Sequence, residues 1–144
     1  MHNNITFKIA SLNDLSAIRK IGDRLFDHPI KNNRATEFLS DPRHHLILAY
    51  DDDEIVGMAS GFHYVHPDKD PELFINEVAV LEEYRNMHIG RNLVEKICAH
   101  GKDLGCREVW VLTDDSNSAA IKAYLAAGGT ENSEQIKMIN FLLR

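Results

Sequence analysis

The sequence predicts an α/β protein built around one mixed β-sheet. Its 144 residues, 44% hydrophobic and 26% charged, suit one globular domain that forms its own core. Apolar residues recur with period two in some segments and with helical spacing in others, in the order β-α-α-β-β-β-α-β-α-β. No repeat, low-complexity tract or linker divides the chain, so we treat residues 1–144 as a single domain.

The first elements are a strand and two helices. Residues 5–9 alternate apolar and polar side chains, which is typical of a strand. Asn13 or Asp14 is expected to cap a helix that ends at Asp27-His28-Pro29. A second short helix is expected over about residues 31–40.

Three strands are expected in the middle of the chain. Residues 46–50 and 55–65 form two of them, joined by a tight turn at 51–53. Residues 73–81 form the third, and a polar turn follows at 82–85.

The last third predicts two helices and two strands. A long helix covers residues 89–104, and a buried strand covers residues 109–112. A helix from residue 115 to residue 127 is stopped by Gly128-Gly129, and a final strand is expected over about residues 136–143.

Composition excludes several classes of protein. With 22 acidic and 16 basic residues, the net charge of −6 argues against nucleic acid as a partner. The apolar runs are far shorter than the roughly 20 residues of a membrane span. No secretory signal is visible at the start, and Cys98 and Cys106 are expected to be reduced thiols, so we expect a cytoplasmic protein.

A strand-to-helix connection carries the first functional signal. Residues 77–80 end a strand, and a basic loop with Arg85, His88 and Arg91 leads into a helix near Gly90. The first amides of a helix lack intrahelical acceptors and lie at its positive end, where a phosphate binds well. Taken alone, the same pattern also fits an ordinary connection with solvated basic residues.

The second signal lies on the helix that follows. Asn117 and Tyr124 are seven residues apart, so they lie two turns apart on the same side. Ala119, Ala120 and Ala123 keep the surface between them small. Alone, these residues also fit a helix cap and a packing tyrosine.

Together, the two segments resemble the GCN5-related N-acetyltransferase (GNAT) superfamily. The match comprises Val78-Ala79-Val80, then Arg85-x-x-His88-Ile89-Gly90, and then Asn117-x-x-Ala120-x-x-x-Tyr124-x-x-x-Gly128. The resemblance implies the GNAT fold, a single mixed and mostly antiparallel sheet flanked by helices, with acetyl-CoA as co-substrate. It places the pyrophosphate on the loop and the pantetheine along the strand edge. The implied acetyl-CoA-binding residues are Val78, Ala79, Val80, Arg85, Asn86, Met87, His88, Ile89, Gly90, Arg91, Asn117, Ala120 and Tyr124.

This chain departs from the family pattern at three positions. His88 stands where the family usually has a glycine, and histidine is among the residues that tolerate positive φ. Ala126 and Gly129 replace a commonly basic and a commonly aromatic residue. Within the superfamily the chain looks most like the small aminoglycoside 3-N-acetyltransferases, through Phe26-Asp27-x-Pro29 and the ending at residues 138–141.

Two side chains are the candidate catalytic residues. Glu77, expected to share a strand face with Ile75 and Ala79, either accepts the amine proton or only orients the amine. The resemblance makes Tyr124 the general acid for the leaving thiolate and a backbone amide near Val78 the oxyanion donor.

No metal site is predicted. Among the eight histidines, His63 and His66 are expected on opposite faces of a strand, and the adjacent His44 and His45 face apart. No cysteine pair has zinc spacing.

The predicted function is acetyl-CoA-dependent N-acetyl transfer to a primary amine, directly from the thioester. An aminoglycoside or another small polyamine is the expected acceptor, because acidic side chains are available to attract it. A protein or peptide N-acetyltransferase and a non-catalytic CoA-binding regulatory module stay open as alternatives, as does a homodimer, and no membrane partner is expected. The acidic side chains in question are Asp68, Asp70, Glu72, Glu77, Asp114 and Asp115, whereas an anionic acceptor would call on Arg19, Arg24, Lys31 and Arg34.

Overall fold

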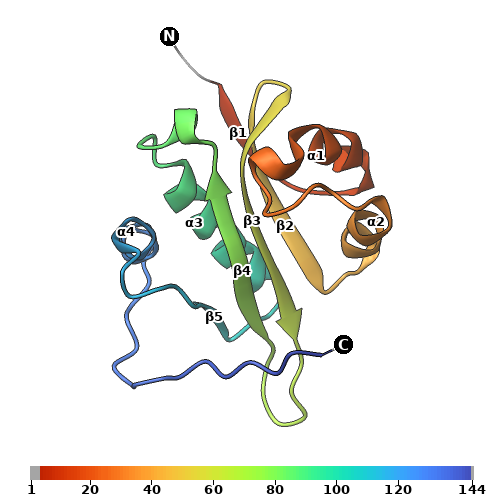
Figure 1. The fold of residues 1–144 in the computed structure, drawn as a ribbon. Coiled ribbons are helices and arrows are strands. Elements are labelled where there is room, and N and C mark those ends of the chain that lie inside the picture. The colour runs from red at the N-terminus through yellow and green to blue at the C-terminus, as the bar shows by residue number, and fades with distance from the viewer. Residues whose placement is uncertain (1–3, 144) are drawn as a thin grey trace.

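The computed structural model describes residues 4–143, which form one five-stranded sheet in the order β1-β2-β3-β4-β5 (Figure 1). The first four strands pair antiparallel in sequence order, and β4 pairs with β5 in parallel. The predicted mixed, mostly antiparallel sheet is therefore confirmed. The strands are β1 (Ile5–Ile9), β2 (His44–Asp51), β3 (Glu54–Tyr64), β4 (Glu72–Val80) and β5 (Glu108–Val111).

Four α-helices flank this sheet, with α1 and α2 on one side and α3 on the other (Figure 1). α3 lies close to the sheet because Gly57 and Gly61 leave room for it: a Cβ on either would lie 3.1–3.3 Å from Leu93 or Ile97 of α3. The helices are α1 (Leu15–Ile21), α2 (Asn32–Ser40), α3 (Ile89–Asp103) and α4 (Ser118–Ala126), with short 3-10 turns η1 (Leu12–Asp14), η2 (Gly22–Arg24) and η3 (Glu82–Tyr84).

The hydrophobic core fills the space between the sheet and its helices. Among the described residues, all buried hydrophobic side chains lie between Ile18 and Ile97. Leu48, Met58 and Leu93 are wholly inaccessible to solvent. The core is therefore made by β2, β3 and β4 together with α1 and α3.

The first helical segment differs from its prediction in its cap and its length. Asp14 occupies the N-cap position of α1, one of the two predicted positions, but its side chain makes no capping bond to that helix. Ser11 caps the preceding 3-10 turn η1 and forms a capping box with Asp14. The α-helix ends at Ile21, because Gly22 adopts a φ of +47°, and only a 3-10 turn continues the segment.

Two predictions near the C-terminus were wrong. β5 is not buried, since its residues alternate between exposed and half-buried and Trp110 is 37% exposed. Residues 136–143 form no strand, although their apolar character suggested one. A strand needs a partner that supplies hydrogen bonds, and the sheet ends at β5 in the described part of the chain.

Candidate functional site

The basic loop before α3 is held by contacts at its start. The amide of Leu81 donates to the carbonyl of Val56 at 2.9 Å, which ties the end of β4 to β3. In η3, the Tyr84 hydroxyl donates to the Asp51 carboxylate at 2.5 Å, and this hydrogen bond raises the pKa of Tyr84 to about 12. The loop thus starts from an anchored turn.

The loop then uses two left-handed residues to enter α3. Asn86 has a φ of +63° and His88 a φ of +61°, so the prediction for His88 is confirmed. His88 is the N-cap residue but makes no side-chain capping bond. The amides of Ile89, Gly90 and Arg91 therefore lack intrahelical acceptors and form an anion-binding end of the helix.

The charges around this helix end come from exposed side chains. Arg85 and Arg91 are exposed, and the Arg91 guanidinium lies 3.1 Å from the Glu95 carboxylate one turn along the helix. A Cβ on Gly90 would meet only a Val80 methyl group, at 3.8 Å. The protein itself thus leaves space at Gly90 for a close neighbour.

Beside this loop, β4 and β5 separate. β4 pairs with β5 only over Glu72–Ile75, yet β4 continues to Val80. Val78, Ala79 and Val80 are half-buried against the core. Their outer backbone edge therefore has no strand partner among the described residues, which is what an extended ligand needs to lie along it.

Asn117, as N-cap residue, and Tyr124 belong to α4, which packs against α3. The Asn117 side-chain oxygen accepts from the Ala120 amide at 3.2 Å, so Asn117 caps the helix. Tyr124 is half-buried, and burial raises the pKa of its hydroxyl. Among residues 4–143, that hydroxyl has no hydrogen-bond partner, and its proton is available for donation at neutral pH.

A bulge in β4 decides where Glu77 points. In the register with β3, Gly61 lies opposite Ile75 but Ser60 lies opposite Glu77, so Asn76 is the extra residue. Gly61 faces α3, hence Ile75 does too, and Glu77 turns to the opposite face. The expectation that Ile75 and Glu77 share a face was therefore wrong.

On that face, Glu77 has two polar neighbours, Asp27 and Ser60, that the sequence did not connect with it. Burial raises the pKa of the Glu77 carboxyl, and the negative charge of Asp27 raises it further. The hydroxyl of the paired residue Ser60 is buried without a hydrogen-bond partner in the described structure. Ser60 lies within an apolar run of the sequence, so only the fold reveals it.

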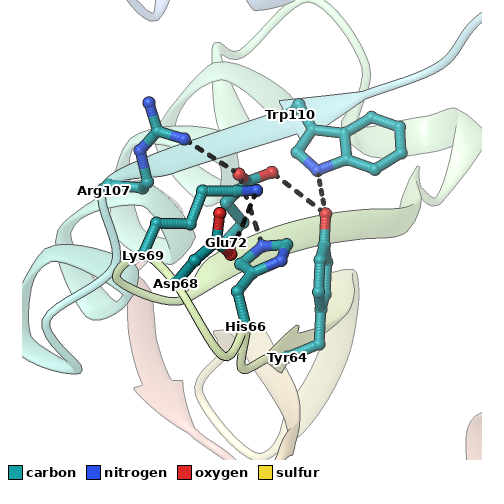
Figure 2. Close-up of polar contacts among 7 residues, drawn as sticks. All are labelled: Tyr64, His66, Asp68, Lys69, Glu72, Arg107 and Trp110. Atoms are coloured by element: carbon teal, nitrogen blue, oxygen red, sulfur yellow. Dashed lines mark hydrogen bonds and ion pairs between the residues drawn. The ribbon is translucent and has the colours of Figure 1, made fainter.

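The Glu72 carboxylate lies apart from Glu77 and has its own partners. Figure 2 shows Tyr64 and Arg107 contacting the Glu72 carboxylate, at 3.1 and 3.4 Å, with His66 3.5 Å away. Glu72 begins β4, whereas Glu77 lies near the end of that strand. The assumed convergence of Glu72 and Glu77 on one cleft was therefore wrong.

Three histidines, one each from β2, β3 and α3, form a hydrogen-bonded chain. His45 Nε2 lies 2.7 Å from His63 Nδ1, and His45 Nδ1 lies 2.9 Å from His100 Nε2. Burial lowers the pKa of His45 to about 4. Nitrogen atoms this close leave no room for a metal ion between them, and no metal-binding group of three or more residues occurs in residues 4–143.

The basic residues near α1 line a separate hollow of about 490 Å³. Glu77, Tyr124 and the basic loop take no part in its lining. The residues that line it are Arg19, Lys20, Ile21, Gly22, Asp23, Arg24, Pro29, Ile30 and Asn32.

A sequence model of the Acetyltransferase (GNAT) family matches residues 12–128. The chain belongs to the GNAT acetyltransferase family. Membership places this GNAT chain among the acyltransferases and confirms the resemblance found in residues 85–90 and 117–128. It is 33% identical over 96 residues to a mycothiol acetyltransferase of Geodermatophilus obscurus, an alignment that covers 63% of the chain. The chain spans 30–63% of the length of the curated relatives it matches.

Solved structures confirm the GNAT fold. An aminoglycoside acetyltransferase from an uncultured soil sample, bound to sisomicin, has a TM-score of 0.87 at 19% identity, covering 97% of each chain. AAC(6')-Iy, bound to a CoA-linked bisubstrate analogue, has a TM-score of 0.79 at 20% identity, covering 97% of this chain and 99% of its own. The name of this second enzyme gives the 6' position, not the 3-N position of the class that the sequence resembled most. At these identities the likeness shows the fold alone.

The GNAT chain also shows no helix suited to crossing a membrane. Its longest described helix, α3, has 15 residues and a charged outer face, and no helix within residues 4–143 is long and apolar enough.

Proposed function

We propose that the protein is an acetyl-CoA-dependent N-acetyltransferase that transfers the acetyl group directly to a primary amine. The observation that carries this proposal is the unpaired edge of β4 at residues 76–80, which leads into the left-handed loop before α3. An extended pantetheine fits such an edge, and a pyrophosphate fits the adjacent helix end.

The binding roles follow from this geometry. The amides of Ile89, Gly90 and Arg91 hold the pyrophosphate, with positive charge from Arg85 and Arg91. Val78, Ala79 and Val80 provide the edge for the pantetheine, and α4 closes the other side with Asn117, Ala120 and Tyr124. Asn86, Met87 and His88 shape the loop between them. When bound, acetyl-CoA supplies the acetyl thioester.

The catalytic roles follow from two protonation states. Glu77, whose pKa is raised by burial, takes the proton of the incoming ammonium, so that a neutral amine attacks the thioester carbon. The C–N bond forms, the C–S bond breaks, and the amide of Val78 stabilises the oxyanion in between. Tyr124, kept protonated by its raised pKa, gives its proton to the leaving thiolate. The second proton that the amine nitrogen loses as the neutral amide forms restores the Tyr124 phenol.

The acceptor we propose is an aminoglycoside or another small polyamine. Two carboxylates, Glu77 and Asp27, lie near enough for the charge of one to raise the pKa of the other, and the partnerless hydroxyl of Ser60 lies beside them. Carboxylates and a free hydroxyl suit an ammonium group that also carries neighbouring donors. Several structurally similar proteins are named aminoglycoside acetyltransferases, which supports the same class. We further propose that residues 1–144 act as one cytoplasmic domain with two free thiols.

The test is an acetyl-CoA turnover screen, read by thiol release, over aminoglycosides, spermidine, amino acids and peptides. Aminoglycosides or spermidine should react fastest, and added salt should lower their kcat/KM. Turnover of neutral or acidic amines alone would refute the acceptor class. Acetyl-CoA binding without any turnover would favour a regulatory module.

Tyr124→Phe tests the general acid. Turnover should fall by about 10²–10⁴-fold, while acetyl-CoA affinity by calorimetry stays close to wild type. Tyr64→Phe, at the Glu72 end of β4, is the matched control and should retain turnover. Wild-type turnover by Tyr124→Phe across the pH range would show that Tyr124 only packs.

A further inference from the structure

Three aromatic rings form a continuous row across β3, β4 and β5. Phe62 is the direct partner of Phe74 in the register of β3 with β4, and Phe74 is the direct partner of Trp110 in β5. The ring centroids lie 5.6 Å apart between Phe62 and Phe74 and 4.6 Å apart between Phe74 and Trp110. These are favourable spacings for aromatic pairs, so each ring holds the next one in place.

This row lies on the face of the sheet that points away from α3. A Cβ on Gly101 of α3 would contact the side chains of Val109 and Leu73, so these two residues face α3. Successive side chains of a strand point to opposite faces of the sheet. Trp110 and Phe74, which follow Val109 and Leu73, therefore point to the face opposite α3.

At β5 the row is open to solvent. On this face α1 and α2 pack mainly on β3 and β2, whereas β4 and β5 contact α3 on the other face. Trp110 is 37% exposed, and Figure 2 shows its six-membered ring pointing away from the polar contacts around Glu72. An exposed indole face attracts cations, and its packing on a neighbouring ring keeps it preorganised. Phe74 and Trp110 together form what we call the aromatic floor.

Carboxylates lie at both ends of the aromatic floor. Glu77 follows Phe74 on this face three residues along β4, about 10 Å away. On β5, Glu108 is exposed and lies two residues before Trp110, hence on the same face. Glu108 has no ion-pair partner in the described part of the chain. Because Glu108 lies opposite Glu72 in the register, Glu77 and Glu108 are about 15 Å apart.

We propose that the acceptor is an aminoglycoside of two or more rings whose unreacted rings lie on the aromatic floor, and that Trp110 and Glu108 select it over single-ring amines. This inference rests on the proposed function, in which Glu77 receives the amine that reacts. Aminoglycosides carry several ammonium groups on rings with apolar C–H faces. These faces pack on the Trp110 indole, a neighbouring ammonium gains a cation–π contact, and a distant ammonium pairs with Glu108.

Fluorescence tests the aromatic floor without reference to activity, because Trp110 is the only tryptophan of the chain. The multi-ring aminoglycoside kanamycin should change the emission in a saturable way. The single-ring amine glucosamine should leave the emission unchanged at the same concentrations. Glu108→Gln should raise the Kd for kanamycin about 2–5-fold at low salt, as expected for an exposed charge pair. Asp53→Asn, in the distant turn between β2 and β3, is the control and should keep the wild-type Kd.

Steady-state kinetics tests the selection between acceptors. Trp110→Ala should raise KM for kanamycin about tenfold, with kcat close to wild type and KM for glucosamine unchanged. Trp110→Phe should recover most of this loss, because it keeps an aromatic face beside Phe74. Val65→Ala removes a side chain that is 76% exposed just after β3, and it should leave both KM values unchanged.

The outcomes separate this inference from the proposed function. A saturable change in Trp110 emission without any acetyl transfer would refute the proposed function and support the aromatic floor as a binding surface. Acetylation of kanamycin with unchanged emission, or an equal rise in both KM values in Trp110→Ala, would overturn the aromatic floor and leave the proposed function intact. Circular dichroism checks that the variants fold, and the wild-type titration decides the question if Trp110→Ala does not.

Discussion

Residues 4–101 and residues 102–143 are built very differently. The first part contains every buried hydrophobic residue of the described chain, and β2 and β3 place fully buried side chains such as Leu48 and Met58 at its centre. In the second part no described residue is buried, although it contains β5 and α4. Apolar burial, the main favourable contribution to folding, is therefore concentrated in the first part.

The candidate site draws on both parts. The loop at Arg85–Arg91 and the edge at Val78–Val80 belong to the packed part, where Leu81 and Ile89 are buried on either side of the loop. Asn117 and Tyr124 belong to the second part, which contacts the first mainly through the pairing of β5 with β4, whereas α4 contacts α3. The difference teaches that one half of the site is preorganised by the core, while the other half depends on a helix with few buried contacts.

The largest expected effect is on stability. Leu93→Ala in α3 should lower the free energy of unfolding by about 2–5 kcal/mol, because Leu93 is fully buried and its removal leaves a cavity. The matched change in α4, Leu125→Ala, should cost less than about 1 kcal/mol, since Leu125 is 44% exposed. Urea unfolding followed by circular dichroism measures both losses. Equal losses would contradict the conclusion that apolar burial is concentrated in residues 4–101.

Next in size is a pH dependence that belongs to the packed part alone. Burial lowers the pKa of His45 from 6.5 to about 4, with further lowering from His100, His63 and His44, while Asp41 acts in the opposite direction. Between these values the unfolded chain binds a proton that the folded chain does not. Stability is therefore complete above pH 6.5 and is lost as pH falls, by about 2 kcal/mol between pH 7 and pH 5.

The variant His45→Met isolates this effect. Removing the buried imidazole should flatten the fall in unfolding free energy between neutral and mildly acidic pH. Its exposed neighbour provides the control, and His44→Gln should keep the wild-type pH dependence. If the unfolding free energy of His45→Met still falls between pH 7 and pH 5 as in the wild type, a group other than His45 binds the proton on unfolding.

The smallest expected effect concerns the preorganised half of the site. Gly90→Val should weaken acetyl-CoA binding about tenfold or more, because a branched side chain blocks close approach to the loop backbone. Gly90→Ala should weaken binding less and leave folding intact, since its Cβ meets only a Val80 methyl group at 3.8 Å. Calorimetry on folded variants measures the acetyl-CoA affinity. An unchanged affinity in Gly90→Val would show that the loop is not part of the acetyl-CoA site.

Local patterns predicted most of the fold. Apolar periodicity located β1 to β4, α2 and α3 within a few residues, because each of these elements buries one face against the core. The motif at Arg85–Gly90 predicted the loop and the positive φ of His88, since that conformation is set by the local strand-to-helix turn. At Asn117, helix-cap chemistry is local as well, and the sequence alone indicated it.

Tertiary structure alone decided the features that depend on a partner distant in sequence. The bulge at Asn76 turns Glu77 toward Ser60 and the charge of Asp27, because register is set between strands and not along one. His45, His63 and His100 meet only when β2, β3 and α3 pack together. Residues 136–143 have the composition of a strand but form none in a single chain. The apolar composition of a segment favours its burial, but a strand forms only where another strand supplies its hydrogen bonds.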